Sequence, residues 1–207
     1  MIAPQIDLSF PHRWQAKILS ARPLILPTRH FVYPRDVEEV ERGALEVLIH
    51  PYTPDAPDFD SETWASDEPS PASEPFLATC ALGFRDPVVP TGLWSAPKPD
   101  EVCAVAGGYA YLIDTTAPER FTMLPYRPVL QVLPAVAQSL LLFVGHRSIL
   151  AWCAQGQAWE SARLSDEGVT IGRIQGDTLH GIGWNMQTDK ETPFALDLRT
   201  GKHSEAS

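Results

Sequence analysis

The sequence predicts an all-β protein with minor helical pieces, built as a propeller-like or multi-sheet antiparallel architecture, with a sandwich as the alternative. Two observations predict this class. Short apolar runs of strand length follow one another through the C-terminal half, separated by tight turns. A strand-turn-strand pattern also recurs three times at similar spacing. The 207 residues and 44% apolar content are enough for a folded domain with a core of its own.

The clearest pattern spans residues 138–164. Leu140–Val144 is a continuous apolar run, which indicates a strand covered on both faces. A polar turn that begins with a glycine leads into Ile149–Cys153, whose two faces are again apolar. A second turn leads into a more polar segment at 157–164, which is typical of an outer strand.

The same pattern occurs on both sides of this segment. Upstream it reads EVCAVAGGYAYLIDTTAPERF, and downstream DTLHGIGWNMQTDKETPFALDLRTGKH, which contains a strand over Thr192–Leu198. Taking Tyr109, Ser148 and Thr192 as the starts of corresponding strands gives offsets of 39 and 44 residues. A period near forty, with about four strands in each unit, is typical of propeller blades.

Three units are fewer than the roughly four to eight blades of a closed ring. Either Ala44–His50 and Phe76–Phe84 form the missing strands, or the sheets form a sandwich. The last unit reaches the end of the sequence shortly after Gly201, so its outer strand is expected to come from the N-terminal region.

The strand-then-turn sequence FALDLRTGK resembles the outer hairpin of quinoprotein-type propeller blades, where a short apolar strand ending in Asp leads into Thr-Gly. The resemblance covers about residues 100–203 and implies a propeller fold. It does not place the calcium or quinone ligands of those enzymes in this chain. The sequence TDKETPFALDLRTG is also similar to the ends of uncharacterised bacterial proteins, a resemblance that implies no function.

Residues 1–35 are expected to form a basic, proline-containing arm, followed by a single β-rich domain over 36–207. The prolines of the arm exclude a long helix, so Trp14–Ala21 is expected to be extended or a short helix. Asp36–Arg42 has a capping-box pattern and is predicted to be a helix of one or two turns. Trp94 is expected to pack inward from a proline-rich connection.

The segment 52–75 interrupts the predicted domain. It has seven acidic residues, no basic ones and many prolines and serines, so it cannot bury enough apolar surface to offset its ordering entropy. We expect a mobile acidic loop. The segment contains a single tryptophan, Trp64, besides Tyr52 and Phe59. Trp64 either docks on the domain or contacts a partner.

Bulk properties exclude several function classes. The formal charge of −10 opposes binding to nucleic acid or to an anionic membrane. The three cysteines form no CxxC pair and lie in apolar runs, which favours free thiols in a reducing compartment. The sequence shows neither a secretory signal nor an apolar run long enough to cross a membrane. We therefore expect a cytoplasmic protein.

Most catalytic templates are missing. The sequence has no GxSxG, GxxxxGK[ST], HExxH or GxGxxG motif in the required context, and its histidines and cysteines lack metal-ligand spacing. We expect no cofactor and no metal. Asp114 and Asp197 end corresponding strands and are expected to cap the turns that follow, in preference to acting as a catalytic pair.

The leading hypothesis is a non-catalytic cytoplasmic interaction protein, which binds a cationic protein partner and contacts neither nucleic acid nor membrane. Its partner-binding candidates are Trp64 and the charged loop tip Asp189, Lys190 and Glu191. One alternative is an enzyme whose site is assembled from distant loops, with His146, His180 and nearby carboxylates as the first residues to test.

The other alternative is a carbohydrate or small-ligand binder that uses exposed tryptophans. Trp152, Trp159 and Trp184 are the residues considered for this role, although indoles on repeated strands more often pack in a core.

Overall fold

The computed structural model describes residues 4–35, 43–52 and 74–204. Within these ranges the chain forms seventeen strands and one 3₁₀ turn, η2 (Val136–Gln138), so the all-β prediction is confirmed. The predicted helix at 36–42 lies outside the described residues. So do Trp64 and nearly all of the predicted acidic loop.

The first sheet has the strand order β2-β4-β5-β3. Its strands are β2 (Trp14–Leu19), β4 (Ala44–Pro51), β5 (Phe76–Ala81) and β3 (His30–Tyr33). β4 is antiparallel to both of its neighbours, whereas β3 runs parallel to β5. The two strands expected from Ala44–His50 and Phe76–Phe84 are therefore the centre of a sheet that precedes the three repeated units.

The second sheet has the order β1-β6-β7-β8-β9. Its strands are β1 (Gln5–Asp7), β6 (Gly92–Ser95), β7 (Glu101–Ala106), β8 (Tyr109–Asp114) and β9 (Phe121–Met123). From β6 to β9 the chain runs up and down between neighbours, and β1 joins the edge in parallel with β6.

The third and fourth sheets are four-stranded antiparallel meanders in chain order. The third contains β10 (Gln131–Ala135), β11 (Leu140–Val144), β12 (Ile149–Cys153) and β13 (Gly156–Glu160). The fourth contains β14 (Val169–Gln175), β15 (Thr178–Asn185), β16 (Lys190–Asp197) and β17 (Lys202–Ser204). The strands expected at 140–144 and 149–153 are confirmed.

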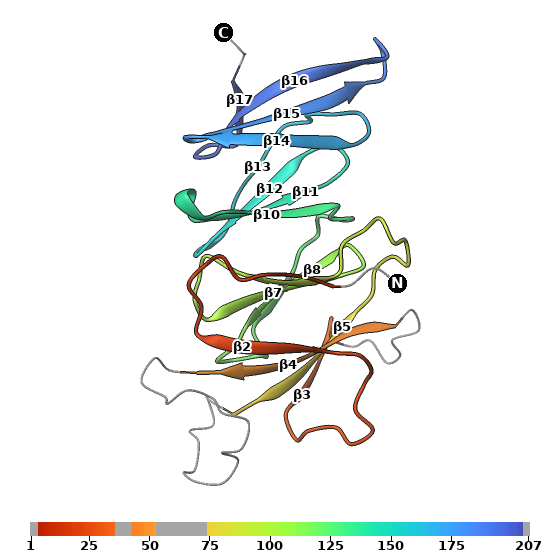
Figure 1. Cartoon of the computed structure of the whole chain (residues 1–207), viewed down its shortest axis with the longest axis vertical. Coiled ribbons are helices and arrows are strands. Elements are labelled where there is room, and N and C mark those ends of the chain that lie inside the picture. The colour runs from red at the N-terminus through yellow and green to blue at the C-terminus, as the bar shows by residue number, and fades with distance from the viewer. Residues whose placement is uncertain (1–3, 36–42, 53–73, 205–207) are drawn as a thin grey trace.

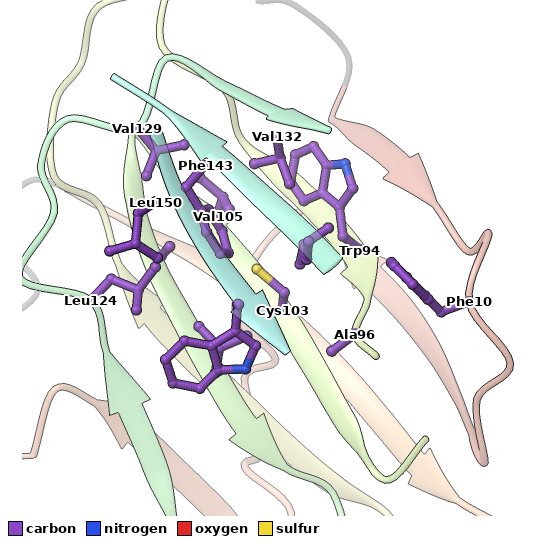
Figure 2. Close-up of a cluster of buried hydrophobic side chains, with 14 residues drawn as sticks. Phe10, Trp94, Ala96, Cys103, Val105, Leu124, Val129, Val132, Phe143 and Leu150 are labelled. Atoms are coloured by element: carbon purple, nitrogen blue, oxygen red, sulfur yellow. The ribbon is translucent and has the colours of Figure 1, made fainter. Parts of the chain in front are cut away.

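The four sheets follow one another in a row, from the first sheet at one end to the fourth at the other (Figure 1). They do not close into a barrel within the described ranges. Three apolar clusters fill the spaces between consecutive sheets, and Figure 2 shows the cluster between the second and third. Alternation along each strand explains this arrangement. In β11, Leu141 and Phe143 face the second sheet, whereas Leu140, Leu142 and Val144 face the fourth.

The N-terminal region differs from the expected arm. Trp14 begins a regular strand and is completely buried, and its indole N–H donates to the Glu101 carbonyl at 3.2 Å. Of the two forms expected for 14–21, the short helix was wrong and the extended form is correct, although the segment is a paired strand and not a loose arm. Residues 4–35 contribute strands to two sheets: β2 and β3 pair with β4 and β5, and their buried side chains pack against the second sheet, which β1 joins at its edge.

The expected donation of an N-terminal strand to the last unit was also wrong. β1 pairs with β6 in the second sheet, and the outer strand of the fourth sheet is its own β17. A tight turn makes this possible: Gly201, at φ 68°, reverses the chain directly after Asp197–Thr200.

The indole of Trp152 lies between the second and third sheets, so its removal should be costly. Trp152 is 7% exposed, and its Nε1 donates to Glu101 Oε2 at 2.7 Å. We expect Trp152→Ala to lower the free energy of unfolding by about 3–5 kcal/mol, because it leaves a cavity and an unpaired carboxylate. Trp152→Phe, which keeps most of the ring, should cost clearly less. Denaturant unfolding of both variants checks this, and a wild-type midpoint for Trp152→Ala would contradict the burial.

Candidate functional site

A cleft of about 610 Å³ opens among the connections between strands of the second, third and fourth sheets. We call it the arginine cleft. Four segments line it: residues 126–128 before β10, the β11–β12 turn at 145–148, residues 163–167 before β14, and the end of β15 with the turn that follows, at 184–186. The cleft therefore forms at one end of the strands of the third and fourth sheets, together with the connection that leads from the second sheet to the third.

One wall of the arginine cleft is held by a tyrosine. The Tyr126 hydroxyl donates to the Ser148 carbonyl and accepts from Ser148 Oγ at 3.3 Å. Its ring lies so close to Gly145 that a Cβ there would be 2.6 Å from the hydroxyl oxygen. Burial raises the pKa of Tyr126 to about 12, so its hydroxyl stays neutral at physiological pH.

The opposite wall depends on backbone contacts between neighbouring sheets. The carbonyl of Arg147 accepts the N–H of Leu164 at 2.7 Å, and the carbonyl of Trp184 accepts that of Asp166 at 2.8 Å. A Cβ on Gly183 would lie 1.9 Å from the Leu164 carbonyl oxygen, so only glycine allows this approach. The walls are thus fixed by hydrogen bonds and close packing.

Three guanidinium groups line the cleft, each in a different setting. Arg163 forms an ion pair with Asp166 and donates to the Ser165 carbonyl at 3.2 Å. Arg127 lies over the Tyr109 ring, 4.9 Å from its centroid. The exposed side chain of Arg147 has no ion pair or hydrogen bond with any residue in the described part of the chain. Arg147 is therefore available to an incoming group.

The two histidines proposed for an enzyme site are not brought together. His146 is exposed and lines the arginine cleft. His180 lies within β15, opposite Ala195 on β16, and is not among the residues that line the cleft. They do not form a joint catalytic arrangement.

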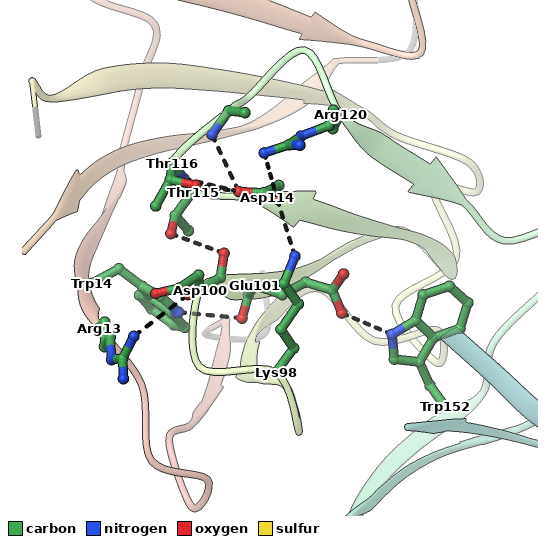
Figure 3. A network of polar contacts seen from close by, with 11 residues as sticks. Arg13, Trp14, Lys98, Asp100, Glu101, Asp114, Thr115, Thr116, Arg120 and Trp152 are labelled. Carbon is green, nitrogen blue, oxygen red and sulfur yellow. Dashed lines mark hydrogen bonds and ion pairs between the residues drawn. The ribbon is translucent and has the colours of Figure 1, made fainter. Parts of the chain in front are cut away.

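A second polar site lies where β7 begins and β8 ends (Figure 3). Glu101 and Asp114 are direct cross-strand neighbours there. They line a cleft of about 610 Å³ together with Arg35, Lys98 and Arg120. We call it the carboxylate cleft. Trp152, which contacts Glu101 of the carboxylate cleft, lies near the end of β12, whereas the turn before β12 lines the arginine cleft. The two clefts therefore lie at opposite ends of the strands.

Asp114 is held as a carboxylate. Its Oδ1 accepts the N–H of Thr116 at 3.1 Å and that of Ala117 at 3.2 Å, while Oδ2 lies 3.0 Å from Lys98 Nζ and 3.3 Å from Arg120. Burial alone would raise the pKa of Asp114. The hydrogen bonds from Thr116 and Lys98, with the Lys98 charge, outweigh it and hold the pKa below its ordinary value.

Glu101 is shifted in the opposite direction. Burial raises its pKa, and the nearby Asp114 charge adds to the effect. The hydrogen bond from Trp152 and the charge of Lys98 oppose the shift without cancelling it. Two neighbouring carboxyl groups whose pKa values are driven apart form the pattern that general acid and base pairs use.

The predicted turn caps are confirmed at both aspartates. Asp114 caps the turn after β8, and Asp197 Oδ1 accepts the N–H of Arg199 at 2.8 Å after β16. That backbone hydrogen bond is the main reason why the pKa of Asp197 lies below its ordinary value.

Two of the three tryptophans considered for ligand binding pack against apolar clusters and line neither cleft. Trp152 is buried between sheets, and Trp159 lies over Gly201 with its Nε1 donating to the Leu198 carbonyl at 2.8 Å. Trp184 is half-buried and lines the arginine cleft.

The other predicted binding residues lie at a loop tip. Asp189, at φ 52°, precedes β16, which begins at Lys190, and Glu191 follows on the same strand. All three side chains are exposed and line neither cleft. Trp64 lies outside the described residues.

The described residues contain no group of three or more His, Cys, Asp and Glu side chains placed to hold a metal ion. Cys80, Cys103 and Cys153 are free thiols, and burial raises the pKa of the first two. None of the helical segments in the described ranges has the length and apolar character needed to cross a membrane.

Sequence reasoning missed both clefts. Arg127, Arg147 and Arg163 are far apart in the sequence and match no motif; their one shared signal is that each lies in a connection between strands. In comparisons with protein families, with curated proteins and with solved structures, no significant match to this chain was found.

The opposite pKa shifts predict opposite pH dependences. The raised pKa of Glu101 means that its contribution to stability is present below the unfolded pKa and is lost as the pH rises through the folded pKa. Glu101→Gln stays neutral and can still accept from Trp152. We expect it to be at least as stable as wild type near pH 7 and to show no advantage below about pH 4.

Asp114→Asn should behave in the reverse way. The lowered pKa of Asp114 gives stability that is present above the unfolded pKa and lost as the pH falls through the folded pKa. Asn can keep the turn cap but not the ion pairs, so we expect a loss of about 1–2 kcal/mol near pH 7 that vanishes in acid. Denaturant unfolding at both pH values is the measurement, and parallel behaviour of the two variants would contradict the assignment.

Proposed function

We propose that the chain is a non-catalytic interaction protein that binds a cationic protein partner. The observation that carries this proposal is the separation of charge along the chain. Of the 16 basic residues, all but Arg42 lie in the described ranges, whereas 11 of the 26 acidic residues fall at 36–42, 53–73 and 205–207. The described part is neutral in formal charge, so the net charge of −10 comes from these short acidic stretches.

The two internal acidic stretches are attached to the same sheet. Residues 36–42 connect β3 to β4, and residues 53–73 connect β4 to β5, so both belong to the first sheet. Acidic segments attached to one sheet of an otherwise neutral chain favour encounter with a cationic surface and raise its association rate.

We also propose that the four sheets are propeller-like blades. Each has four or five strands, most of them joined to their sequence neighbours, and the turn after β16 carries the Asp-x-x-Thr-Gly pattern. This supports the resemblance to quinoprotein-type blades as a relation of architecture, without their cofactor. The three free thiols support a reducing compartment, and we propose the cytoplasm.

The second candidate function is an enzyme that uses the carboxylate cleft. The observation that favours it is the pair Glu101 and Asp114, whose pKa values are shifted in opposite directions. Such a pair matches the acid and the carboxylate of glycoside hydrolysis. This site replaces His146 and His180 as the first place to test for catalysis.

The interaction proposal predicts no turnover of a panel of nitrophenyl glycosides. The assay compares wild type with Glu101→Gln, which keeps the hydrogen-bond acceptor for Trp152 and removes the titrating proton. Hydrolysis by wild type that Glu101→Gln abolishes at unchanged stability would establish the enzyme function instead.

Neutralising the acidic segment should weaken partner binding. The variant replaces each of seven residues by Asn or Gln: Asp55, Asp58, Asp60, Glu62, Asp67, Glu68 and Glu74. We expect slower association with the partner captured from native lysate, because exposed charges act through a field that salt screens over about 8 Å. Raising the salt concentration should weaken wild-type capture in the same way.

The matched control exchanges Asp for Glu and Glu for Asp at the same seven positions, so the charge is kept while the side chains change. We expect this control to capture the same proteins as wild type. Equal capture by the control and the neutralised variant would remove the acidic segment from the binding mechanism.

A further inference from the structure

We infer that the arginine cleft binds a small molecule that joins an oxyanion group, phosphate or carboxylate, to a planar ring. Arg147 would hold the oxyanion and Trp184 the ring. This inference is separate from the proposed protein partner, because it concerns the connections between the second, third and fourth sheets and not the acidic stretches of the first.

Charge favours an anion in this cleft although the whole chain is acidic. Three arginines line it against Asp166 and Glu167, which leaves a formal excess of one positive charge. Arg163 is already paired with Asp166. Arg127 lies over the Tyr109 ring, whereas the Arg147 side chain has no ion pair, hydrogen bond or ring contact among the described residues. The planar fork of Arg147 matches a carboxylate or a phosphate with two parallel hydrogen bonds.

The backbone of Arg147 is held in place before any ligand binds. Its carbonyl accepts two N–H groups, from Leu164 at 2.7 Å and from Ser165 at 3.3 Å. The turn that carries it is closed by Gly145 N–H donating to the Ser148 carbonyl at 3.2 Å. A fixed backbone reduces the entropy that binding must remove, so the exposed side chain is positioned near the mouth of the cleft.

The other lining groups suit a flat, unsaturated ring. Trp184 presents a half-buried indole, and its backbone N–H donates to Ser165 Oγ at 2.9 Å, which fixes the end of β15. Met186 is 64% exposed beside it, and a thioether adapts to the edge of an aromatic ring. Base or ring stacking on an indole is favourable without demanding one ring structure.

The size of the cleft agrees with a small molecule. Its volume of about 610 Å³ lies within the roughly 300–1,000 Å³ of small-molecule sites. The neutral Tyr126 hydroxyl is engaged with Ser148, so it adds no negative charge that would repel an anion.

Calorimetric titration of the full chain with four probes tests the inference. Phenyl phosphate and benzoate carry both features and distinguish phosphate from carboxylate, inorganic phosphate carries the oxyanion alone, and phenol carries the ring alone. We expect at least one of the first two to bind more than tenfold more tightly than inorganic phosphate or phenol. Failure of both to bind at millimolar concentration would overturn the inference.

Variants assign the two halves of the site. Arg147→Gln should weaken the better probe at least tenfold, whereas the matched control Arg173→Gln, an exposed arginine on β14 outside the cleft, should leave affinity unchanged. Equal weakening by both would show general electrostatic attraction and overturn the site.

Trp184→Leu should weaken phenyl phosphate or benzoate while leaving the weak affinity for inorganic phosphate unchanged. Trp184→Phe keeps an aromatic face and should recover most of the affinity, which separates a role in stacking from a loss of folding. Full affinity in Trp184→Leu would remove the ring half of the inference.

Discussion

The structure depends on the burial of both faces of its middle sheets. Strands β7, β8, β11 and β12 carry apolar side chains at nearly every position, so neither face of the second or third sheet tolerates water. A sheet of this kind needs a neighbour on each side. The row of four sheets with three apolar layers satisfies that requirement, and the first and fourth sheets end the row.

The first sheet has a polar network on its other face: Thr79 Oγ1 donates to Glu46 Oε2 at 2.6 Å and contacts His30 Nε2 at 2.9 Å.

Stacking also determines where polar chemistry can gather. Side chains within strands are used for the apolar layers, so charged groups collect where strands end and connections begin. The arginine cleft and the carboxylate cleft lie at opposite ends of the strands for this reason. Trp152 contributes to both an apolar layer and a polar cleft. Its ring packs between the second and third sheets, and its Nε1 donates to Glu101 in the carboxylate cleft.

The sequence predicted the parts of the fold that depend on neighbouring residues. The unbroken apolar run at 140–144 indicated a strand covered on both faces, and the aspartates that end β8 and β16 indicated turn caps. The parallel pairs β1–β6 and β3–β5 could not be predicted, since they join segments more than forty residues apart with no turn between them. The prolines around Trp14 indicated an extended arm, but the Trp14 indole is buried by strands that lie much later in the sequence. The arginine cleft was missed because only the stacking of the sheets brings its residues together, whereas Glu101 and Asp114 of the carboxylate cleft are cross-strand neighbours within one sheet.

The two proposed binding features have opposite sign and can coexist because they are separated along the row. The acidic stretches are attached to the first sheet, and the arginine cleft is centred on the third. Neighbouring sheets pack about 10 Å apart, so the attachment points lie roughly 20 Å from the cleft. That distance exceeds the Debye length of about 8 Å at physiological ionic strength, so charge at those attachment points is largely screened from Arg147. A cationic surface and a small anion would therefore bind to independent parts of one chain. Salt would weaken binding of the cationic surface more, because the small anion is also held by its ring on Trp184.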